Sequence, residues 1–201
     1  MGCPCNSDLS CWQTRQDGPE ETPDNPAPIP KNDTENTYAI NDEIGNSLIY
    51  FANLTSLSNP AKAYLFSDKL SRVPILCLLE AHKGPEDLQT IKSEFRKNGR
   101  SVIINPAQLT GNGGTHGGEI IAYLNKINVN TVTKIILQNA VEYTNSVLRC
   151  AALVVNKADL PFLLITGYFW SGEGATERNY NIFQQFIIIK KHYKLPTLII
   201  C

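Results

Sequence analysis

From residue 46 onward, continuous apolar runs alternate with short segments rich in Gly, Asn and Pro. Runs of this length that are rich in Ile, Leu and Val are typical of strands buried on both faces of a sheet. The pattern therefore predicts strands over residues 47–53, 73–80, 101–105, 119–124, 131–138, 145–156, 161–169 and 195–201.

The run over residues 145–156 alternates between its two faces. Every second residue falls on one of them, namely Val147, Arg149, Ala151, Leu153 and Val155. A period of two, with one face towards a core, is typical of antiparallel pairing. We therefore expect antiparallel strands around residues 131–156.

Three segments between these strands have helical patterns. Residues 59–70 begin with Asn59 as a cap and Pro60 at the first helical position. Residues 85–98 are amphipathic and are followed by Gly99, a typical helix end. Residues 175–194 carry an apolar stripe and end in lysines, which suit the negative end of a helix dipole. Strands and helices in this order predict an α/β fold.

Residues 1–45 differ from the rest of the chain. They contain nine acidic and two basic residues, a net charge of −7, and are rich in Pro and polar residues. Such a segment cannot bury enough surface to offset its ordering entropy, so we expect a disordered acidic tail. Its cysteines at positions 3, 5 and 11 give only weak hints of a zinc site or of lipidation. Residues 46–201 carry a net charge of +6, which favours partners that bear phosphate.

Two of the predicted strands end in polar residues that suit metal and phosphate chemistry. Asn53 ends the run over residues 47–53, and Glu80 ends the run over residues 73–80. In open α/β folds, the carboxyl ends of strands are where ligands bind. A carboxylate and a carboxamide suit a hard cation and a phosphate oxygen. Each could instead be an ordinary strand end or turn residue.

The order of several landmarks carries a family resemblance. They are a strand ending in Asn53, a strand ending in Leu79–Lys83, a turn at Thr115–Gly118, a strand ending in Gly167–Tyr168, a helix opening at Gly172–Asn179 and a strand over residues 196–201. In this order the chain resembles the endonuclease/exonuclease/phosphatase superfamily, which includes abasic-site nucleases and non-LTR retroelement endonucleases. The resemblance covers residues 46–201 as the N-terminal portion of such a domain. It implies a truncated four-layer α/β/β/α sandwich.

The resemblance also implies roles for single residues. Glu80 would be the metal ligand for Mg²⁺ (or Mn²⁺), and Asn53 and Tyr168 would be catalytic. Lys83 and Arg178 would contact the nucleic-acid backbone. Tyr168 could instead be a core aromatic, and exposed cations commonly touch nothing. His82 and His116 are interpreted as structural histidines, and the glycine-rich loop over residues 110–118 as a turn with positive φ rather than a phosphate-binding loop.

The sequence departs from the family pattern in ways that bear on activity. Leu79 and Ala81 replace the usual Gln and Thr beside the metal-binding Glu, and Glu119 stands where an apolar residue is usual. The Gly-Asp-Phe-Asn-like and Ser-Asp-His motifs, which supply the later catalytic groups, do not occur by residue 201.

The resemblance implies a Mg²⁺-dependent phosphodiesterase of endonuclease type that acts on nucleic acid, with DNA as the first expectation. We expect it to be incomplete and inactive as given. The alternatives are an inactive retroelement remnant that binds nucleic acid weakly, or a phosphatase of the same fold. The sequence shows no membrane span, no signal peptide and no obligate protein partner, so we expect an intracellular protein of the nucleus or cytoplasm.

Overall fold

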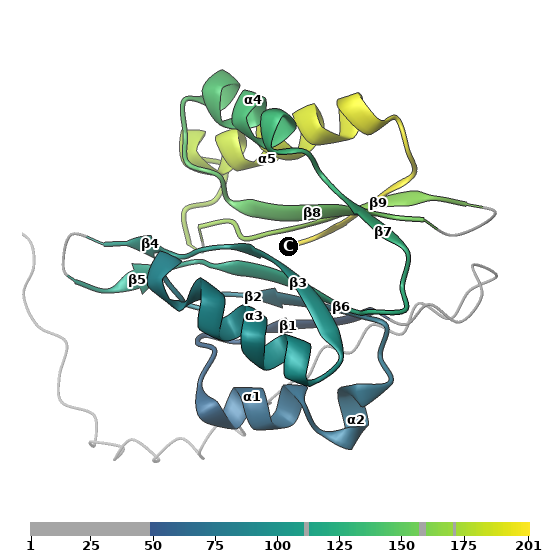
Figure 1. Ribbon diagram of the computed structural model, residues 1–201. Coiled ribbons are helices and arrows are strands. Elements are labelled where there is room, and N and C mark those ends of the chain that lie inside the picture. The colour runs from purple at the N-terminus through teal and green to yellow at the C-terminus, as the bar shows by residue number, and fades with distance from the viewer. Residues whose placement is uncertain (1–48, 111–112, 157–159, 171) are drawn as a thin grey trace, which may run out of the picture. The chain divides into compact units, whose positions relative to one another are not determined.

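The computed structural model describes residues 49–110, 113–156, 160–170 and 172–201 (Figure 1). All of them belong to one compact unit, residues 35–201. The predicted tail over residues 1–45 and its cysteines lie outside the described residues, as do residues 47–48 of the first predicted strand. The described residues form a mixed α/β fold with several sheets and five α-helices.

The first sheet has four strands in the order β1-β2-β6-β3. They are β1 (Ile49–Asn53), β2 (Ile75–Leu79), β6 (Glu119–Leu124) and β3 (Arg100–Asn105). Strands β1 and β2 are parallel, while β6 runs antiparallel to both of its neighbours. The carboxyl ends of β1, β2 and β3 and the start of β6 therefore lie at the same end of the sheet.

The second sheet has four strands in the order β10-β9-β8-β7. They are β10 (Thr197–Ile200), β9 (Phe162–Gly167), β8 (Cys150–Val155) and β7 (Val129–Thr131). Strand β8 is antiparallel to β7 and β9, as the alternation in its sequence predicted, and β10 is parallel to β9. A separate two-stranded sheet joins β4 (Gln108–Leu109) to β5 (Thr115–His116).

Each four-stranded sheet lies between two apolar cores, because successive side chains of a strand point to opposite faces. In β2, Ile75 and Cys77 pack against the second sheet, where Ala151, Leu153 and Leu164 face them. Leu76 and Leu78 point the other way and pack under helices of the first half of the chain. These helices are α1 (Asn59–Leu65), α2 (Asp68–Ser71) and α3 (Leu88–Lys97), with the short 3-10 helix η1 (Pro85–Asp87) before α3.

Two more helices cover the outer face of the second sheet (Figure 1). They are α4 (Lys134–Thr144) and α5 (Glu177–Tyr193), which contact one another. Ile136 of α4 and Phe186 of α5 pack with Cys150 and Ile165 of the sheet. Among the described residues, no helix has the length and apolar character needed to cross a membrane.

The predicted strand over residues 131–138 is wrong. Strand β7 ends at Thr131, and the chain enters helix α4 at Lys134. The buried residues of α4 are Ile136, Ala140 and Thr144, a spacing of four that matches the helical period. The β-branched residues at positions 132–136 imitate a strand locally, but packing against α5 decides for the helix.

Smaller differences concern the ends of elements. The helix predicted over residues 59–70 is divided into α1 and α2, and its cap is Ser58, whose Oγ accepts a hydrogen bond from the Ala61 N–H at 3.4 Å. Asn59 is therefore already helical. The predicted loop over residues 110–118 contains β5, and residues 111–112 lie outside the described residues.

Candidate active site

Asn53 and Glu80 are neighbours at the end of the first sheet. The register of the parallel pair sets Asn53 opposite Leu79, so Glu80 is the next residue along β2. The backbone N–H of Leu54 donates to the Leu79 carbonyl at 3.0 Å, which holds the two strand ends together. This register places both residues at one edge of the sheet, as expected from their positions at the ends of two apolar runs.

The second sheet brings further groups to the same end. Cys150 is the partner of Gly167, so Arg149 and Tyr168 flank this pair at the start of β8 and the end of β9. Two hydrogen bonds connect the residues just before β8 to β3 and to β5. Asn105 Nδ2 donates to the Leu148 carbonyl at 2.9 Å, and Arg149 Nη1 donates to the His116 carbonyl at 3.3 Å. The polar ends of the two sheets therefore meet.

Glu80 has a backbone conformation that is uncommon for its residue type. Its φ is +52°, in the left-handed region, and its side chain is half-buried. The following backbone is held by the Gly117–Gly118 segment, because Ala81 N–H donates to Gly118 O and His82 N–H to Gly117 O, both at 3.0 Å. Within the described residues, the Glu80 carboxylate has no hydrogen bond or ion pair. Non-glycine residues held at positive φ cluster at functional sites.

Asn53 and Tyr168 stand in different surroundings. Asn53 is exposed, and its Oδ1 accepts a hydrogen bond from the Thr55 N–H at 3.1 Å, so it does form the local turn contact considered above. The contact leaves the side-chain NH₂ of Asn53 available as a donor. Tyr168 is half-buried and lies near Arg149. Burial lowers the pKa of the Arg149 guanidinium, against opposing effects of Glu119 and Tyr168.

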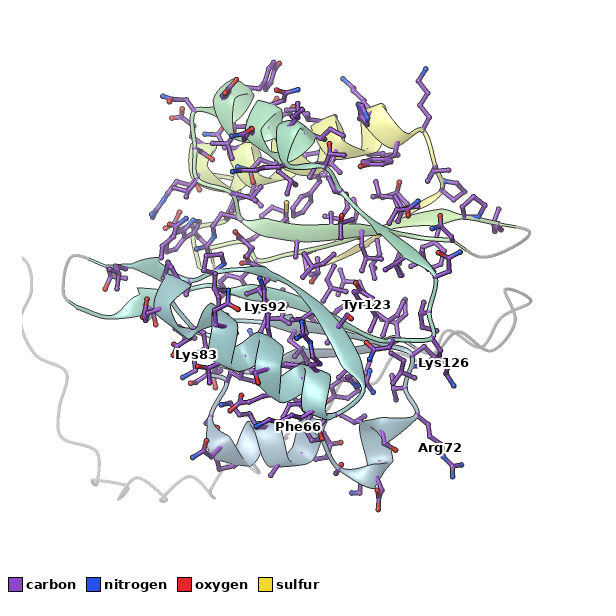
Figure 2. All side chains as sticks on the ribbon, in the orientation of Figure 1. Phe66, Arg72, Lys83, Lys92, Tyr123 and Lys126 are labelled. Carbon is purple, nitrogen blue, oxygen red and sulfur yellow. The ribbon has the colours of Figure 1, made fainter. Side chains whose placement is uncertain are left out.

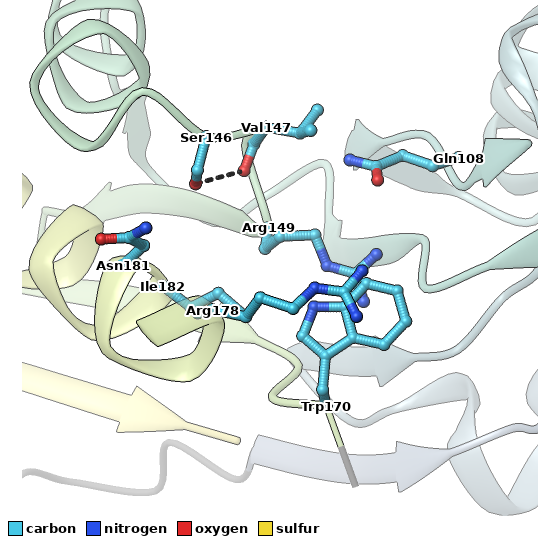
Figure 3. Close-up of a pocket in the computed structure, with 8 residues that line it drawn as sticks. All are labelled: Gln108, Ser146, Val147, Arg149, Trp170, Arg178, Asn181 and Ile182. Carbon is cyan, nitrogen blue, oxygen red and sulfur yellow. Dashed lines mark hydrogen bonds between the residues drawn. The ribbon is translucent and has the colours of Figure 1, made fainter. Parts of the chain in front are cut away.

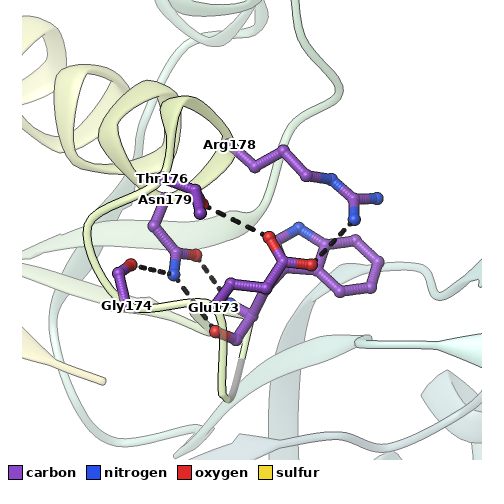
Figure 4. A network of polar contacts seen from close by, with 6 residues as sticks. Glu173, Gly174, Thr176, Arg178 and Asn179 are labelled. Atoms are coloured by element: carbon purple, nitrogen blue, oxygen red, sulfur yellow. Dashed lines mark hydrogen bonds and ion pairs between the residues drawn. The ribbon is translucent and has the colours of Figure 1, made fainter. Parts of the chain in front are cut away.

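The two predicted nucleic-acid contacts also differ. Lys83 is half-buried and lies three residues after Glu80 in the sequence. Figure 2 shows it towards the end of the molecule that carries β4 and β5, away from Arg72 and Lys126. Arg178 is in the first turn of α5, where its Nη1 pairs with Glu173 Oε1 at 3.0 Å (Figure 4). Its Cζ lies 3.8 Å from the centroid of the Trp170 ring. Arg178 is thus an ordered cation rather than a free one.

Sequence reasoning missed two charged residues of this site. Glu119 is 0% exposed and Arg149 is 4% exposed, although charged side chains are rarely buried unless they are paired. Burial raises the pKa of Glu119 to about 7, against an opposing effect of the nearby Arg149. The sequence offered one signal for their burial, since Glu119 and Arg149 each stand at the start of an apolar run.

The two histidines have structural contacts. The ring nitrogen Nδ1 of His82 lies 2.7 Å from the carbonyl oxygen of Thr115. The ring of His116 lies 4.0 Å from that of Trp170, between centroids. Burial, together with the positive charge of Arg149, lowers the pKa of His116. Within the described part of the chain, neither His82 nor His116 is held by a carboxylate as a general base would be.

The donor set suits some metals better than others. Among the described residues, no group of three or more His, Cys, Asp or Glu side chains could hold a metal ion. Structural zinc sites need four such ligands, whereas Mg²⁺ binds through one or two carboxylates and keeps several waters. The unpaired carboxylate of Glu80 therefore fits Mg²⁺ or Mn²⁺ with a phosphate oxygen as a further ligand.

Comparisons with known proteins found similarity at the level of structure alone. No protein-family model matches the sequence, and no curated protein matches it. One similar solved structure is the endonuclease domain of TRAS1, a telomere-specific non-LTR retrotransposon, with 14% identity and a TM-score of 0.43. Another is the AP endonuclease LMAP from Leishmania major, with 15% identity and a TM-score of 0.43. Each match covers 72% of this chain and 54% or 46% of the solved chain, so this chain spans about half the length of each.

Proposed function

We propose that this chain carries the metal-binding and phosphate-binding end of a Mg²⁺-dependent (or Mn²⁺-dependent) phosphodiesterase of endonuclease type, which acts on nucleic acid. The observation that carries the proposal is Glu80. Its half-buried carboxylate stands at a φ of +52° beside Asn53, with no hydrogen bond or ion pair to the described residues. A carboxylate left unpaired in such a place is suited to a cation.

The same proposal extends to the fold. Three apolar cores lie between helices and the first sheet, between the two sheets, and between the second sheet and helices. We take this to be the four-layer α/β/β/α sandwich of the endonuclease/exonuclease/phosphatase superfamily. In that arrangement the strand ends that carry Asn53, Glu80 and Tyr168 belong to one site.

Each side chain then has a distinct task. A bound divalent cation would supply positive charge to the phosphate and to the leaving oxygen. Glu80 would hold the cation, with water as the remaining ligands. The NH₂ group of Asn53 would donate to a phosphate oxygen, and the hydroxyl of Tyr168 would donate to a non-bridging oxygen on which charge develops.

Nucleic acid is the substrate class that the charge of residues 46–201 favours. Residues 46–201 carry a net charge of +6, and neutralising phosphates releases counterions from the nucleic acid. Because no carboxylate orients His82 or His116 as a general base within the described residues, we expect the 201-residue chain to bind without turning over. A phosphatase of the same fold would instead cleave small phosphate monoesters.

Metal binding tests this proposal without depending on turnover. Binding of Mn²⁺ to the purified chain, measured by electron paramagnetic resonance, should weaken about tenfold or more in Glu80→Gln. Glu142→Gln, which changes an exposed carboxylate of α4, is the matched control and should bind as the wild type does. Equal affinity in Glu80→Gln and the wild type would show that Glu80 is not the ligand.

Substrate choice needs a second measurement. Supercoiled plasmid and a small phosphate monoester are incubated with the chain and Mg²⁺, and products are followed. We expect neither to be cleaved and the plasmid to be bound. Cleavage that Glu80→Gln abolishes would support the metal site and contradict the expected inactivity. Cleavage of the monoester alone would support the phosphatase alternative.

A further inference from the structure

A small pocket lies beside the candidate active site (Figure 3). It has a volume of about 100 Å³ and lies between the loop from α4 to β8 and the first turns of α5. Its polar lining consists of Gln108, Ser146, Arg149, Trp170, Arg178 and Asn181. Two of these residues are cations and none is an acid, so the lining is suited to an anion.

The pocket contains buried donors without acceptors. Arg149 is 4% exposed, and its Nε and Nη2 have no hydrogen-bond partner among the described residues. The same holds for Nε2 of Gln108. A buried donor that lacks an acceptor destabilises the fold, so such groups in native proteins call for an explanation. An oxyanion in the pocket would supply the acceptors.

The guanidinium of Arg149 is held in place by its neighbours. Its Nη1 donates to the His116 carbonyl, and its backbone N–H donates to Gln185 Oε1 at 3.1 Å. Gly117 makes room for it, because a Cβ at Gly117 would come within 2.7 Å of Arg149 Nη1. A donor fixed in this way loses little entropy when it binds a ligand.

Arg178 is held beside the same ring as Arg149. Figure 3 shows both side chains converging on Trp170, and the Cζ atoms lie 3.8 Å (Arg178) and 4.7 Å (Arg149) from the ring centroid. Asn179 fixes this arrangement, since its side chain bonds both backbone groups of Trp170, at 2.7 and 3.1 Å, and the Gly174 carbonyl at 2.8 Å. Figure 4 shows the resulting network, in which Glu173 is the acidic partner of Arg178.

We infer that this pocket binds a phosphate oxyanion, as a subsite separate from the cation held by Glu80. Arginine forks match the oxygen geometry of phosphate, and two nearby cations repel one another less when an anion lies between them. We assign the phosphate to a nucleic-acid strand, and this assignment rests on the proposed function, whereas the capture of an oxyanion rests on the pocket alone. Glu173, which forms an ion pair with Arg178, remains as a competing acid.

The fluorescence of Trp170 can report binding. The chain has two tryptophans, so a Trp12→Phe background leaves Trp170 as the reporter. Inorganic phosphate is titrated at constant ionic strength without divalent cations, and a saturable change is expected. Arg149→Lys and Arg178→Gln should each weaken binding about tenfold or more, since each removes charge-assisted hydrogen bonds to the anion. The exposed Arg72, at the end of α2 and outside the pocket lining, provides the control Arg72→Gln.

The outcomes separate this inference from the proposed function. Absence of a saturable change, or equal affinities in all variants, would overturn the subsite. Because the Arg178 side chain is 59% exposed, Arg178→Gln stays informative even if Arg149→Lys fails to fold. A short single-stranded DNA should displace phosphate, and failure to do so would overturn the nucleic-acid assignment. Glu80→Gln should keep phosphate binding while losing Mn²⁺, so loss of both would contradict two separate subsites.

Discussion

The carboxylate of Glu119 and the guanidinium of Arg149 are buried together where the two sheets meet, but no direct ion pair joins them within the described residues. Asn105 connects the surroundings of the two charged residues. Its Nδ2 donates to Glu119 Oε2 at 2.6 Å and to the carbonyl of Leu148, the residue before Arg149. Glu119 Oε1 has no partner in this part of the chain. The incomplete pairing explains why burial still dominates the pKa of Glu119.

The stability of the protein should depend on the charge of Glu119. Its pKa of about 7 lies above the usual 4.5, so the folded state binds more protons than the unfolded state between these values. Stability contributed by the neutral form is therefore full below about pH 4.5 and is lost as the pH rises through 7. Glu119→Gln stays neutral, and its free energy of unfolding relative to wild type should rise by about 2–3 kcal/mol between pH 4.5 and 8.

Urea unfolding at both pH values measures this difference. Glu142→Gln, on the exposed face of α4, serves as the control and should show no such change with pH. A difference between Glu119→Gln and wild type that does not vary with pH would mean that Glu119 is already ionised at low pH or fully paired at high pH.

A side chain at Gly117 should destabilise the fold. Gly117→Ala places a Cβ at a φ of +74° and against the Arg149 guanidinium, which together should destabilise the fold by about 2–4 kcal/mol. Gly99→Ala is the matched control, because Gly99 has a φ of +72° with no atom near the added Cβ, and should cost only about 1–2 kcal/mol. Thermal unfolding of both variants gives the comparison. Equal losses would mean that Arg149 moves aside freely.

Glu80 should be a position where function opposes stability. Glycine relieves the cost of a φ of +52°, so Glu80→Gly should raise the free energy of unfolding by about 0.5–1 kcal/mol while abolishing Mn²⁺ binding. Thr55→Gly relieves a similar φ of +51° at a residue with no proposed metal contact, and should keep the metal affinity. Denaturant unfolding and Mn²⁺ titration together test this, and a destabilised Glu80→Gly would contradict it.

The helical assignment of residues 134–144 has its own test. Ile136 is 5% exposed and packs against the second sheet, so Ile136→Ala should cost about 2–4 kcal/mol. Its neighbour Ile135 is 68% exposed, and Ile135→Ala should change stability by less than about 0.5 kcal/mol. Gln138→Pro, which removes a backbone donor within α4, should lower the helical circular dichroism signal, as it would not in a strand.

Local sequence was enough to place Asn53 and Glu80 together. Each ends an apolar run, and these two runs pair as parallel strands whose ends meet. Local sequence was also enough for the faces of β8, since Ala151, Leu153 and Val155 do share the core between the sheets. It failed for α4, because the β-branched residues at positions 132–136 favour a strand locally and only packing against α5 decides for the helix.

The apolar pattern by itself determined most of the strands, most helices and the edge at which Asn53 and Glu80 stand, because these depend on periodicity within short segments. The burial of Glu119, the position of Arg149 against Gly117 and the convergence of Arg149 and Arg178 on Trp170 depend on how two sheets and a helix meet. Contacts between residues far apart in the chain leave no periodic signal. Only the tertiary structure therefore shows that Arg149, which the sequence places in an alternating apolar run, is a buried donor of the candidate phosphate subsite.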